Sequence, residues 1–286
     1  MHFKSLFLSA IAVSSATAGR TCGTKNPTNE QKLIAQNFQL KEDAALSQAR
    51  LTGNGTSSVQ AAINVKIYYH VVAISTAASG GYLPQSALTA QTGVLNLAYA
   101  PYQISFTQAS VDYTVNTNWA NDRSEGAMKK ALHKGTFADL NVYFVYNSAY
   151  LGYAYYPSDL NPNNAAQVYY DGVVVVSSTV PGGTAPYNLG HTLTHESGHW
   201  FGLVHTFGDG NDGQGCSIGD FISDTPDEAS AAYYCETGRD TCPTAGLDPI
   251  WNYMDYSDDD CFTGFTDGQG TRMHSQWESY RAAYQV

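Results

Sequence analysis

The chain has 286 residues, of which 43% are hydrophobic and only 14% are charged, and its formal net charge is -11. Globular proteins usually carry about 25% charged residues, so we expect a polar surface with few charges. A basic patch of the kind that binds nucleic acid is not expected. The hydrophobic content is sufficient for a core, and the length fits one large domain or two small ones.

The first 18 residues have the pattern of a secretion signal. Lys4 supplies positive charge, residues 6–13 form a short apolar run, and Ala16-Thr17-Ala18 is a small-residue cleavage site. The apolar run is too short to span a bilayer, and no later stretch approaches about 20 apolar residues, so we predict no membrane span. A buried N-terminal helix is the alternative. Secretion implies an oxidising compartment in which disulfides form.

Residues 19–60 are interpreted as a leader that precedes the main domain. They are rich in Gln, Asn, Lys, Ala and Ser and poor in aromatic residues, which favours a helical or loosely ordered segment over a part of the core. We therefore predict a signal peptide (1–18), a pro-segment (19–60) and one large domain (61–286). Asn54 begins the one acceptable N-glycosylation sequon, although such short sequons are often unused.

From Ile63 onward, β-branched and aromatic runs alternate with segments of good helix formers. We predict strands at 65–72, 104–115, 140–146, 151–156 and 173–176, and helices at 85–99 and 125–133. This alternation predicts an α+β fold with one mixed sheet and helices packed on it. Gly, Asp and Cys punctuate roughly the last 80 residues, which we predict to be rich in loops.

A further helix is predicted over 189–201, with Asn188 as its N-cap. It carries two histidines, His195 and His199, that are separated by four residues. Because this separation is close to one helical turn, both side chains project from one face about 6 Å apart and can hold one metal ion. Glu196 points slightly aside, where it can act on a water without becoming a ligand.

Gly202 can adopt the left-handed conformation that ends this helix, and the turn can bring His205 back as a third ligand. Three histidines leave a fourth position open for water, which is typical of a catalytic zinc site. The alternative, three unconnected histidines, requires five fixed positions to match with a chance probability of about 10⁻⁵. His191 has no glutamate after it and would close the open position, so we interpret it as a packing or ligand-orienting residue.

Met254 lies in the segment NYMDY (252–256), about 50 residues after the histidine motif. The motif 195–205 followed by this methionine resembles the metzincin clan, in which a Met-turn forms an apolar floor beneath zinc. A methionine alone would be core filler. The segment DTP (224–226) extends the similarity to the pappalysin family of secreted zinc metalloproteinases. The resemblance is specific over about 187–272, and it implies a metzincin-type catalytic domain with a smaller loop-rich C-terminal subdomain.

The resemblance implies an extracellular endopeptidase that cleaves protein or peptide substrates with one catalytic zinc ion. In such an enzyme Glu196 is the general base for the attacking water. Tyr256 occupies the position of a tyrosine whose hydroxyl reaches the transition-state oxyanion, a contact that can contribute about 3 kcal/mol. It is, however, one tyrosine among 21. The predicted strand 151–156 would hold an extended substrate by strand addition.

Two other functions are compatible with the same metal site. One is a secreted zinc-containing binding or adhesion module that has lost catalysis, which would have no need of Glu196 between its ligands. The other is a metallohydrolase that acts on non-peptide amides. The predicted edge strand and the family resemblance separate this last class from a peptidase.

Four cysteines of the C-terminal region can form disulfides in three pairings, among which sequence physics does not choose. The family resemblance implies Cys216 with Cys242 and Cys235 with Cys261. It also implies a calcium site in the acidic loop 220–227, for which the side-chain ligands would be Asp220, Thr225 and Asp227. A solvated acidic loop is the alternative, and the loop is not an EF-hand.

Two further residues carry expectations that come from the resemblance. Asp259, by its family position, lies in the pocket for the residue after the scissile bond, where an acidic group would favour Arg or Lys. A solvated run of charges is the alternative. Cys22 resembles a leader cysteine that ligates zinc and holds secreted relatives latent, since a thiolate is an excellent zinc ligand. A free or intermolecular thiol is the alternative.

Overall fold

The computed structural model describes residues 21–52, 60–208 and 215–286. The predicted signal peptide (1–18) and the sequon at Asn54 lie outside the described residues, so their predictions stay open. Among the described residues, no helix has both the length and the apolar character that crossing a membrane requires.

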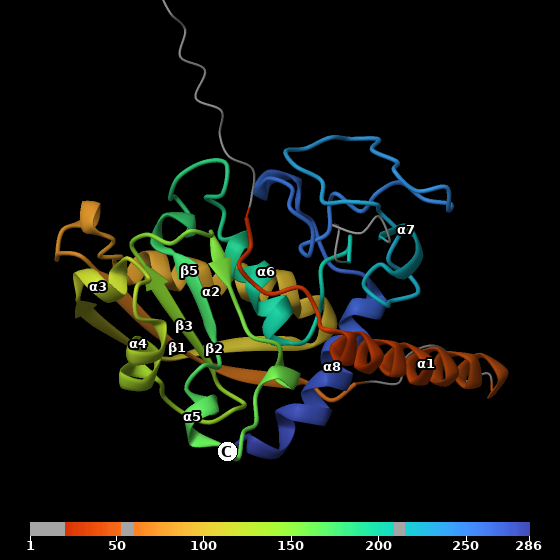
Figure 1. Cartoon of the computed structure of the whole chain (residues 1–286), viewed down its shortest axis with the longest axis horizontal. Coiled ribbons are helices and arrows are strands. Elements are labelled where there is room, and N and C mark those ends of the chain that lie inside the picture. The colour runs from red at the N-terminus through yellow and green to blue at the C-terminus, as the bar shows by residue number, and fades with distance from the viewer. Residues whose placement is uncertain (1–20, 53–59, 209–214) are drawn as a thin grey trace, which may run out of the picture.

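The centre of the molecule is a five-stranded mixed sheet with the strand order β2-β1-β3-β5-β4 (Figure 1). Four strands run parallel and the edge strand β4 runs antiparallel to β5. The strands are β1 (Ile63–Ala73), β2 (Ile104–Val115), β3 (Leu140–Val145), β4 (Gly152–Tyr153) and β5 (Val173–Val176). The four-valine run of β5 lies inside the sheet, as its continuous hydrophobicity predicts.

Helices cover both faces of the sheet. Two of them, α2 and α6, contact each other and the sheet around a core that includes Tyr99, Phe106 and Phe201. A smaller cluster on the other face contains Val72, Tyr143 and Met128. The helices are α1 (Asn29–Thr52), α2 (Gln85–Tyr99), α3 (Thr117–Ala120), α4 (Glu125–Leu132), α5 (Ala165–Val168), α6 (His191–Trp200), α7 (Gly215–Ile218) and α8 (Asp267–Tyr280). Short 3₁₀ turns lie at Ala78–Gly80, Ala100–Tyr102, Pro157–Asp159, Ser177–Thr179, Asp259–Cys261 and Ala282–Tyr284.

The predicted mixed sheet with packed helices is confirmed, and two local predictions differ from the structure. Helix α8 lies in the region that was predicted to be loops, and it begins with a capping box in which Thr266 and Gln269 bond each other's backbone. The predicted strand 151–156 pairs with β5 only at Gly152 and Tyr153. Beyond them, the Asp159 carboxylate accepts from the Tyr156 amide at 3.3 Å at the start of a 3₁₀ turn, which ends the strand.

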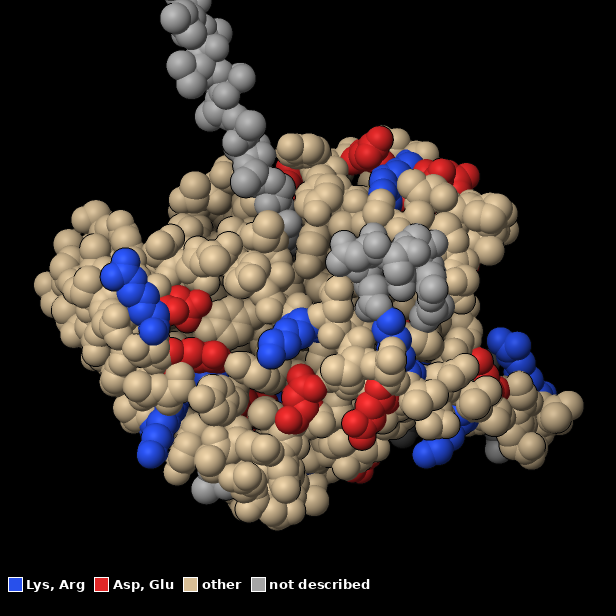
Figure 2. Space-filling view, viewed as in Figure 1, with Lys and Arg blue, Asp and Glu red and all other residues tan. Residues whose placement is uncertain are grey.

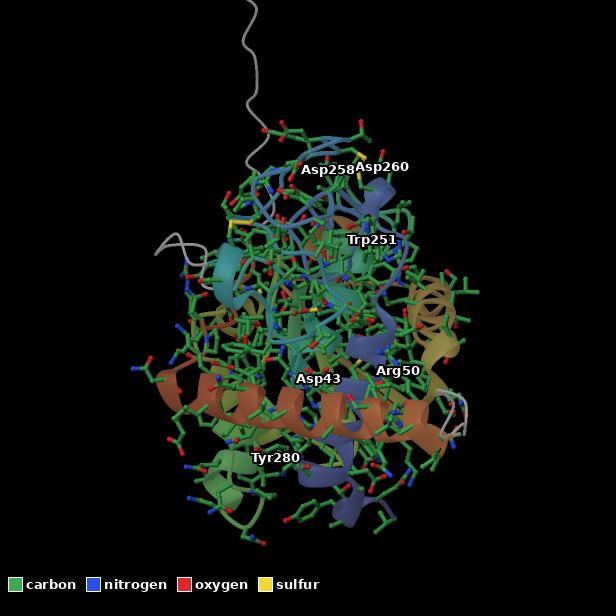
Figure 3. All side chains as sticks on the ribbon, turned by 90° about the vertical axis from the view of Figure 1, so that its right-hand side faces the viewer. Asp43, Arg50, Trp251, Asp258, Asp260 and Tyr280 are labelled. Atoms are coloured by element: carbon green, nitrogen blue, oxygen red, sulfur yellow. A yellow bond between two sulfur atoms is a disulfide. The ribbon has the colours of Figure 1, made fainter. Side chains whose placement is uncertain are left out.

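The leader contains the long helix α1, which lies across α8 (Figure 3). Glu42 of α1 pairs with the buried Arg272 of α8 at 2.9 Å, and the Phe38 ring lies 5.8 Å from the same guanidinium. Leu33 and Leu51 of α1 are exposed. The leader helix is therefore fixed to the domain by one buried ion pair, together with hydrogen bonds of Gln39 and Asp43 to Ser223.

Residues 201–266 form a loop region in which the described residues make one short helix, α7, and one 3₁₀ turn. Two disulfides, Cys216–Cys242 and Cys235–Cys261, join it with Cα–Cα distances of 5.3 and 5.7 Å. These are the pairs that the family resemblance implies. The charged side chains on the face shown in Figure 2 are few and scattered, in keeping with the low charge content.

Candidate active site

Helix α6 begins at His191, so the prediction that Asn188 caps it is wrong. Gly190 precedes the helix with a φ of 90°, a left-handed conformation that suits glycine. The cap comes from far along the chain: Asp259 accepts hydrogen bonds from the backbone amides of Leu189 (2.8 Å) and His191 (3.4 Å). A carboxylate at the positive end of a helix stabilises it.

The side chains of His195, His199 and His205 meet beneath α6, and all three are buried. Their Nε2 atoms are 3.1, 3.2 and 3.3 Å apart. Three nitrogens that bind one tetrahedral zinc at about 2.0–2.1 Å are separated by about 3.3–3.4 Å, so the three rings fit one zinc ion without rearrangement.

Backbone carbonyls orient two of these rings. Nδ1 of His195 donates to the Tyr253 carbonyl at 2.7 Å, and Nδ1 of His199 donates to the Leu203 carbonyl at 2.8 Å. With the proton on Nδ1, the lone pair of Nε2 faces the centre of the cluster. Nδ1 of His205 has no hydrogen-bond partner among the described residues.

Burial keeps the imidazoles of His199 and His205 neutral. It lowers the pKa of His199 to about 4 and holds the pKa of His205 well below its ordinary value, with the neighbouring His199 as the second cause. A neutral imidazole is the form that binds a metal. The burial of the site therefore favours the ligand form of the histidines.

A glycine turn delivers the third histidine. Gly202 has a φ of 90°, and Leu203 donates to the Gly198 carbonyl at 2.9 Å, which closes the end of the helix. The helix also requires glycine at position 198, because a Cβ there would lie 2.4 Å from the sulfur of Met254. Met254 is fully buried against the helix, where a Met-turn residue is expected.

Tyr256, two residues after Met254, packs beside the cluster. Its ring centroid lies 4.9 Å from that of His205 and 5.9 Å from that of His195. Burial, followed by the nearby Cys22 and Glu196, raises the pKa of Tyr256, so its hydroxyl keeps its proton and can donate. His191 lies apart from the three-nitrogen cluster and packs against Tyr253 at 5.0 Å between ring centroids.

Glu196 is buried between α6 and the edge strand β4. A Cβ at Gly152 would lie 2.8 Å from Cγ of Glu196, so only glycine allows the strand to approach the carboxylate this closely. Oε2 of Glu196 accepts a hydrogen bond from the Thr24 hydroxyl at 2.9 Å and lies 3.5 Å from Sγ of Cys22. Both contacts come from the leader.

The leader runs along β4 as an added strand. Leu151 donates to the Thr21 carbonyl at 3.0 Å, and Gly23 donates to the Gly152 carbonyl at 2.8 Å. This pairing places Sγ of Cys22 3.6 Å from Nε2 of His199. Among the described residues, Cys22 and the three histidines are the group whose ligand atoms lie within 4.8 Å of one another.

Thr24 is a site residue that sequence reasoning missed. Its hydroxyl donates to Glu196 and accepts from the backbone amide of Ala154 at 2.9 Å. Its position two residues after Cys22 was the available signal, since one strand places residues two apart on the same face. The structure is needed to show that this face meets the glutamate.

The acidic loop brings together some of the predicted calcium ligands. Asp220 is buried and accepts from the Thr225 hydroxyl at 2.9 Å and from the Ile222 amide at 3.0 Å. Burial raises the pKa of Asp220 to about 7. Asp227 lines a cavity of about 800 Å³ between this loop and α1, together with Asp220 and Thr225.

A mixed sheet whose active-site helix packs on a methionine turn is the arrangement of a metzincin metalloprotease. A family profile described as pregnancy-associated plasma protein-A, of peptidase family M43, matches residues 132–278. An extracellular metalloprotease of Colletotrichum graminicola is 57% identical over 289 residues, which cover 100% of both chains.

Two solved structures from Tannerella forsythia share the fold. Mature mirolysin in complex with a cleaved peptide matches with a TM-score of 0.61 at 25% identity, over 76% of this chain and 92% of its own. A variant of promirolysin matches with a TM-score of 0.67 at 24% identity, over 91% of this chain and 94% of its own. The chain belongs to the pappalysin (M43) family of metalloproteases, as the sequence motifs predict.

Proposed function

We propose that this metalloprotease is a secreted zinc endopeptidase in which His195, His199 and His205 hold the metal and Glu196 is the general base. The observation that carries the proposal is the set of three Nε2 atoms 3.1 to 3.3 Å apart with Glu196 beside them. Membership of the M43 family implies zinc-dependent peptide hydrolysis. The export pattern at 1–18 and the name of the 57% identical relative support secretion.

The reaction assigns one task to each residue. Zinc, when bound, supplies Lewis acidity to the water and the substrate carbonyl. Glu196 accepts the proton of the attacking water and returns a proton to the leaving amine, so the carboxylate is regenerated at the end of the cycle. Tyr256 donates its hydroxyl hydrogen bond to the oxyanion, and Met254 supports the ligands from below.

Strand β4 is the proposed docking edge for the substrate. The backbone groups of Gly152 and Ala154 bond the leader in this structure, and an extended peptide would use the same groups by strand addition. Asp259 is proposed to favour Arg or Lys after the scissile bond. Its carboxylate also caps α6, which ties any specificity role to the start of the active-site helix.

The leader is proposed to be an inhibitory pro-segment. Cys22 lies against the histidine cluster and its backbone bonds Tyr256. The Thr24 hydroxyl donates to the carboxylate of Glu196. The match to promirolysin covers 91% of this chain whereas the match to mature mirolysin covers 76%, which supports the leader as the part that maturation removes. Calcium at Asp220, Thr225 and Asp227 and glycosylation at Asn54 are kept as proposals.

Casein cleavage by wild type, Glu196→Gln and Glu278→Gln tests the general base. Each protein is assayed with and without a zinc chelator, before and after limited tryptic digestion that is then quenched. We expect Glu196→Gln to lower kcat by about 10²–10⁴-fold, because the amide cannot accept the proton. Glu278 is an exposed glutamate of α8, so its variant serves as the matched control. Equal activity of Glu196→Gln and wild type would exclude the role of Glu196.

Latency is tested with Cys22→Ala and Thr24→Val in the full chain. Valine keeps the shape of threonine and removes the hydroxyl that bonds Glu196 and Ala154. We expect premature casein cleavage from Cys22→Ala and a smaller increase from Thr24→Val. If both variants stay as inactive as the wild-type precursor until digestion, the leader does not act through these contacts.

A further inference from the structure

The three proposed zinc ligands are not anchored in the same way. Nδ1 of His195 and Nδ1 of His199 each bond a backbone carbonyl directly. Nδ1 of His205 has no such bond within the part of the chain that the structure describes. The His205 ring is instead stacked on Phe207 at 4.7 Å and packed against Tyr256. Ring packing allows sliding, so a precise position for His205 requires that its backbone be fixed.

The residue that fixes this backbone is Thr206. Its amide donates to the Met254 carbonyl at 3.3 Å, and its hydroxyl donates to Oε1 of Glu228 at 2.5 Å. Thr206 and Glu228 are both completely buried. The chain immediately after His205 is thus held between the Met-turn on one side and a buried carboxyl on the other.

Glu228 is itself fixed by a network that extends through the loop region. Its Oε2 accepts from Arg239 at 3.2 Å, and the same guanidinium pairs with the buried Asp248. Asp248 also accepts from the amide of Thr241 at 2.9 Å, next to the disulfide-bonded Cys242. Buried polar networks of this kind are rigid when every member is bonded.

We propose that Glu228 is a positioning residue for the third zinc ligand, acting on His205 through the hydroxyl of Thr206. The inference rests on the proposed zinc site. Two carbonyl groups orient the rings of His195 and His199 directly, whereas Glu228 holds the residue that follows His205 and so fixes the backbone from which the ring projects. It makes no contact with substrate or metal, so its effect is on the affinity and geometry of the site.

The test measures zinc affinity of the full chain by competition with a chelator, for wild type, Thr206→Val, Glu228→Ala and Glu228→Gln. Loss of a residue that orients a metal ligand typically weakens the metal by 10–100-fold, and we expect this from Thr206→Val and Glu228→Ala. Glu228→Gln keeps an acceptor for the Thr206 hydroxyl and should bind zinc within about threefold of wild type. The double variant Thr206→Val/Glu228→Ala should bind zinc no more weakly than the single variant with the larger loss of affinity, because both changes break the same link.

Ser230→Ala is the matched control, since the Ser230 hydroxyl accepts from the same Arg239 at 2.9 Å and, in the part of the chain that the structure describes, does not bond Thr206. Its zinc affinity should equal that of wild type. The inference is overturned if Thr206→Val and Glu228→Ala bind zinc as tightly as wild type, even when their melting temperatures fall, or if Ser230→Ala loses as much. If Glu228→Ala does not fold, Thr206→Val decides. Failure of wild type to bind zinc would instead refute the proposed metal site.

Discussion

His195, Glu196 and His199 come from a helix that packs on a five-stranded sheet, whereas His205, Met254 and Tyr256 come from a loop region with little regular structure. The sheet region is held by a continuous apolar core. The loop region contains two disulfides and the buried ion pairs of Arg239 with Glu228 and Asp248. Tyr253, Met254 and Phe262 of the loop region also belong to the apolar core, so the loop half of the active site depends on covalent and polar contacts in addition to hydrophobic packing.

The largest expected effect tests whether the loop region contributes chemistry as well as support. Tyr256→Phe should lower kcat by about 10²–10³-fold with little change in KM, because the lost hydroxyl acts in the transition state. Peptide hydrolysis is compared with Tyr233→Phe, whose ring lies 6.1 Å from that of Tyr256. A Tyr256→Phe enzyme with wild-type kcat would show that the Tyr256 hydroxyl does not take part in the chemistry.

The next effect concerns the stability of the two regions. Replacing Cys216 and Cys242 by serine should lower the free energy of unfolding by about 3 kcal/mol, because the open chain gains conformational entropy. Leu140→Ala in the sheet core should cost about 2–5 kcal/mol. In denaturant titrations, reductant should leave the cost of Leu140→Ala unchanged and should remove the difference between the serine variant and wild type. A persistent difference in reductant would show that the disulfide is not its source.

A smaller effect is expected where the two regions meet at the start of α6. Asp259→Asn keeps an acceptor for the amides of Leu189 and His191 but removes the negative charge, so it should cost about 0.3–1 kcal/mol of stability. Thermal unfolding measures this cost, and cleavage of peptides with Arg or Leu after the scissile bond measures selectivity. Unchanged selectivity with reduced stability would assign Asp259 to the helix cap alone.

The smallest expected effect lies in the sheet region and depends on pH. Partial burial alone would raise the pKa of Asp112, but hydrogen bonds and charges of His70 and Lys134 outweigh it and hold the pKa below its ordinary value of 3.8. The ion pairs therefore stabilise the fold above pH 3.8 and lose this contribution as the pH falls through the lower, folded-state pKa. Asp112→Asn should be less stable than wild type near pH 6 and equal to it in strong acid. A constant difference at all pH values would contradict this assignment.

Much of the sheet region could be predicted from the sequence. The strand at 104–115 and the helix at 85–99 have the predicted bounds, because their period of hydrophobicity is set by local backbone geometry. The same reasoning places His195 and His199 on one helix face, since four residues span about one turn. The positions of His205 and Met254 relative to the helix motif indicated the protein family, and the family resemblance in turn implied the disulfide pairs.

Tertiary structure decided what local periodicity does not encode. The cap of α6 comes from Asp259 instead of Asn188, because a positive φ at Gly190 turns the chain and a carboxylate about 70 residues away reaches the helix amides. Thr24 meets Glu196, and Glu228 meets Thr206, only through contacts between segments far apart in the chain. The sequence determined which residues can bind the metal, whereas folding determined which residues contact and orient them, because those contacts depend on distances across the chain.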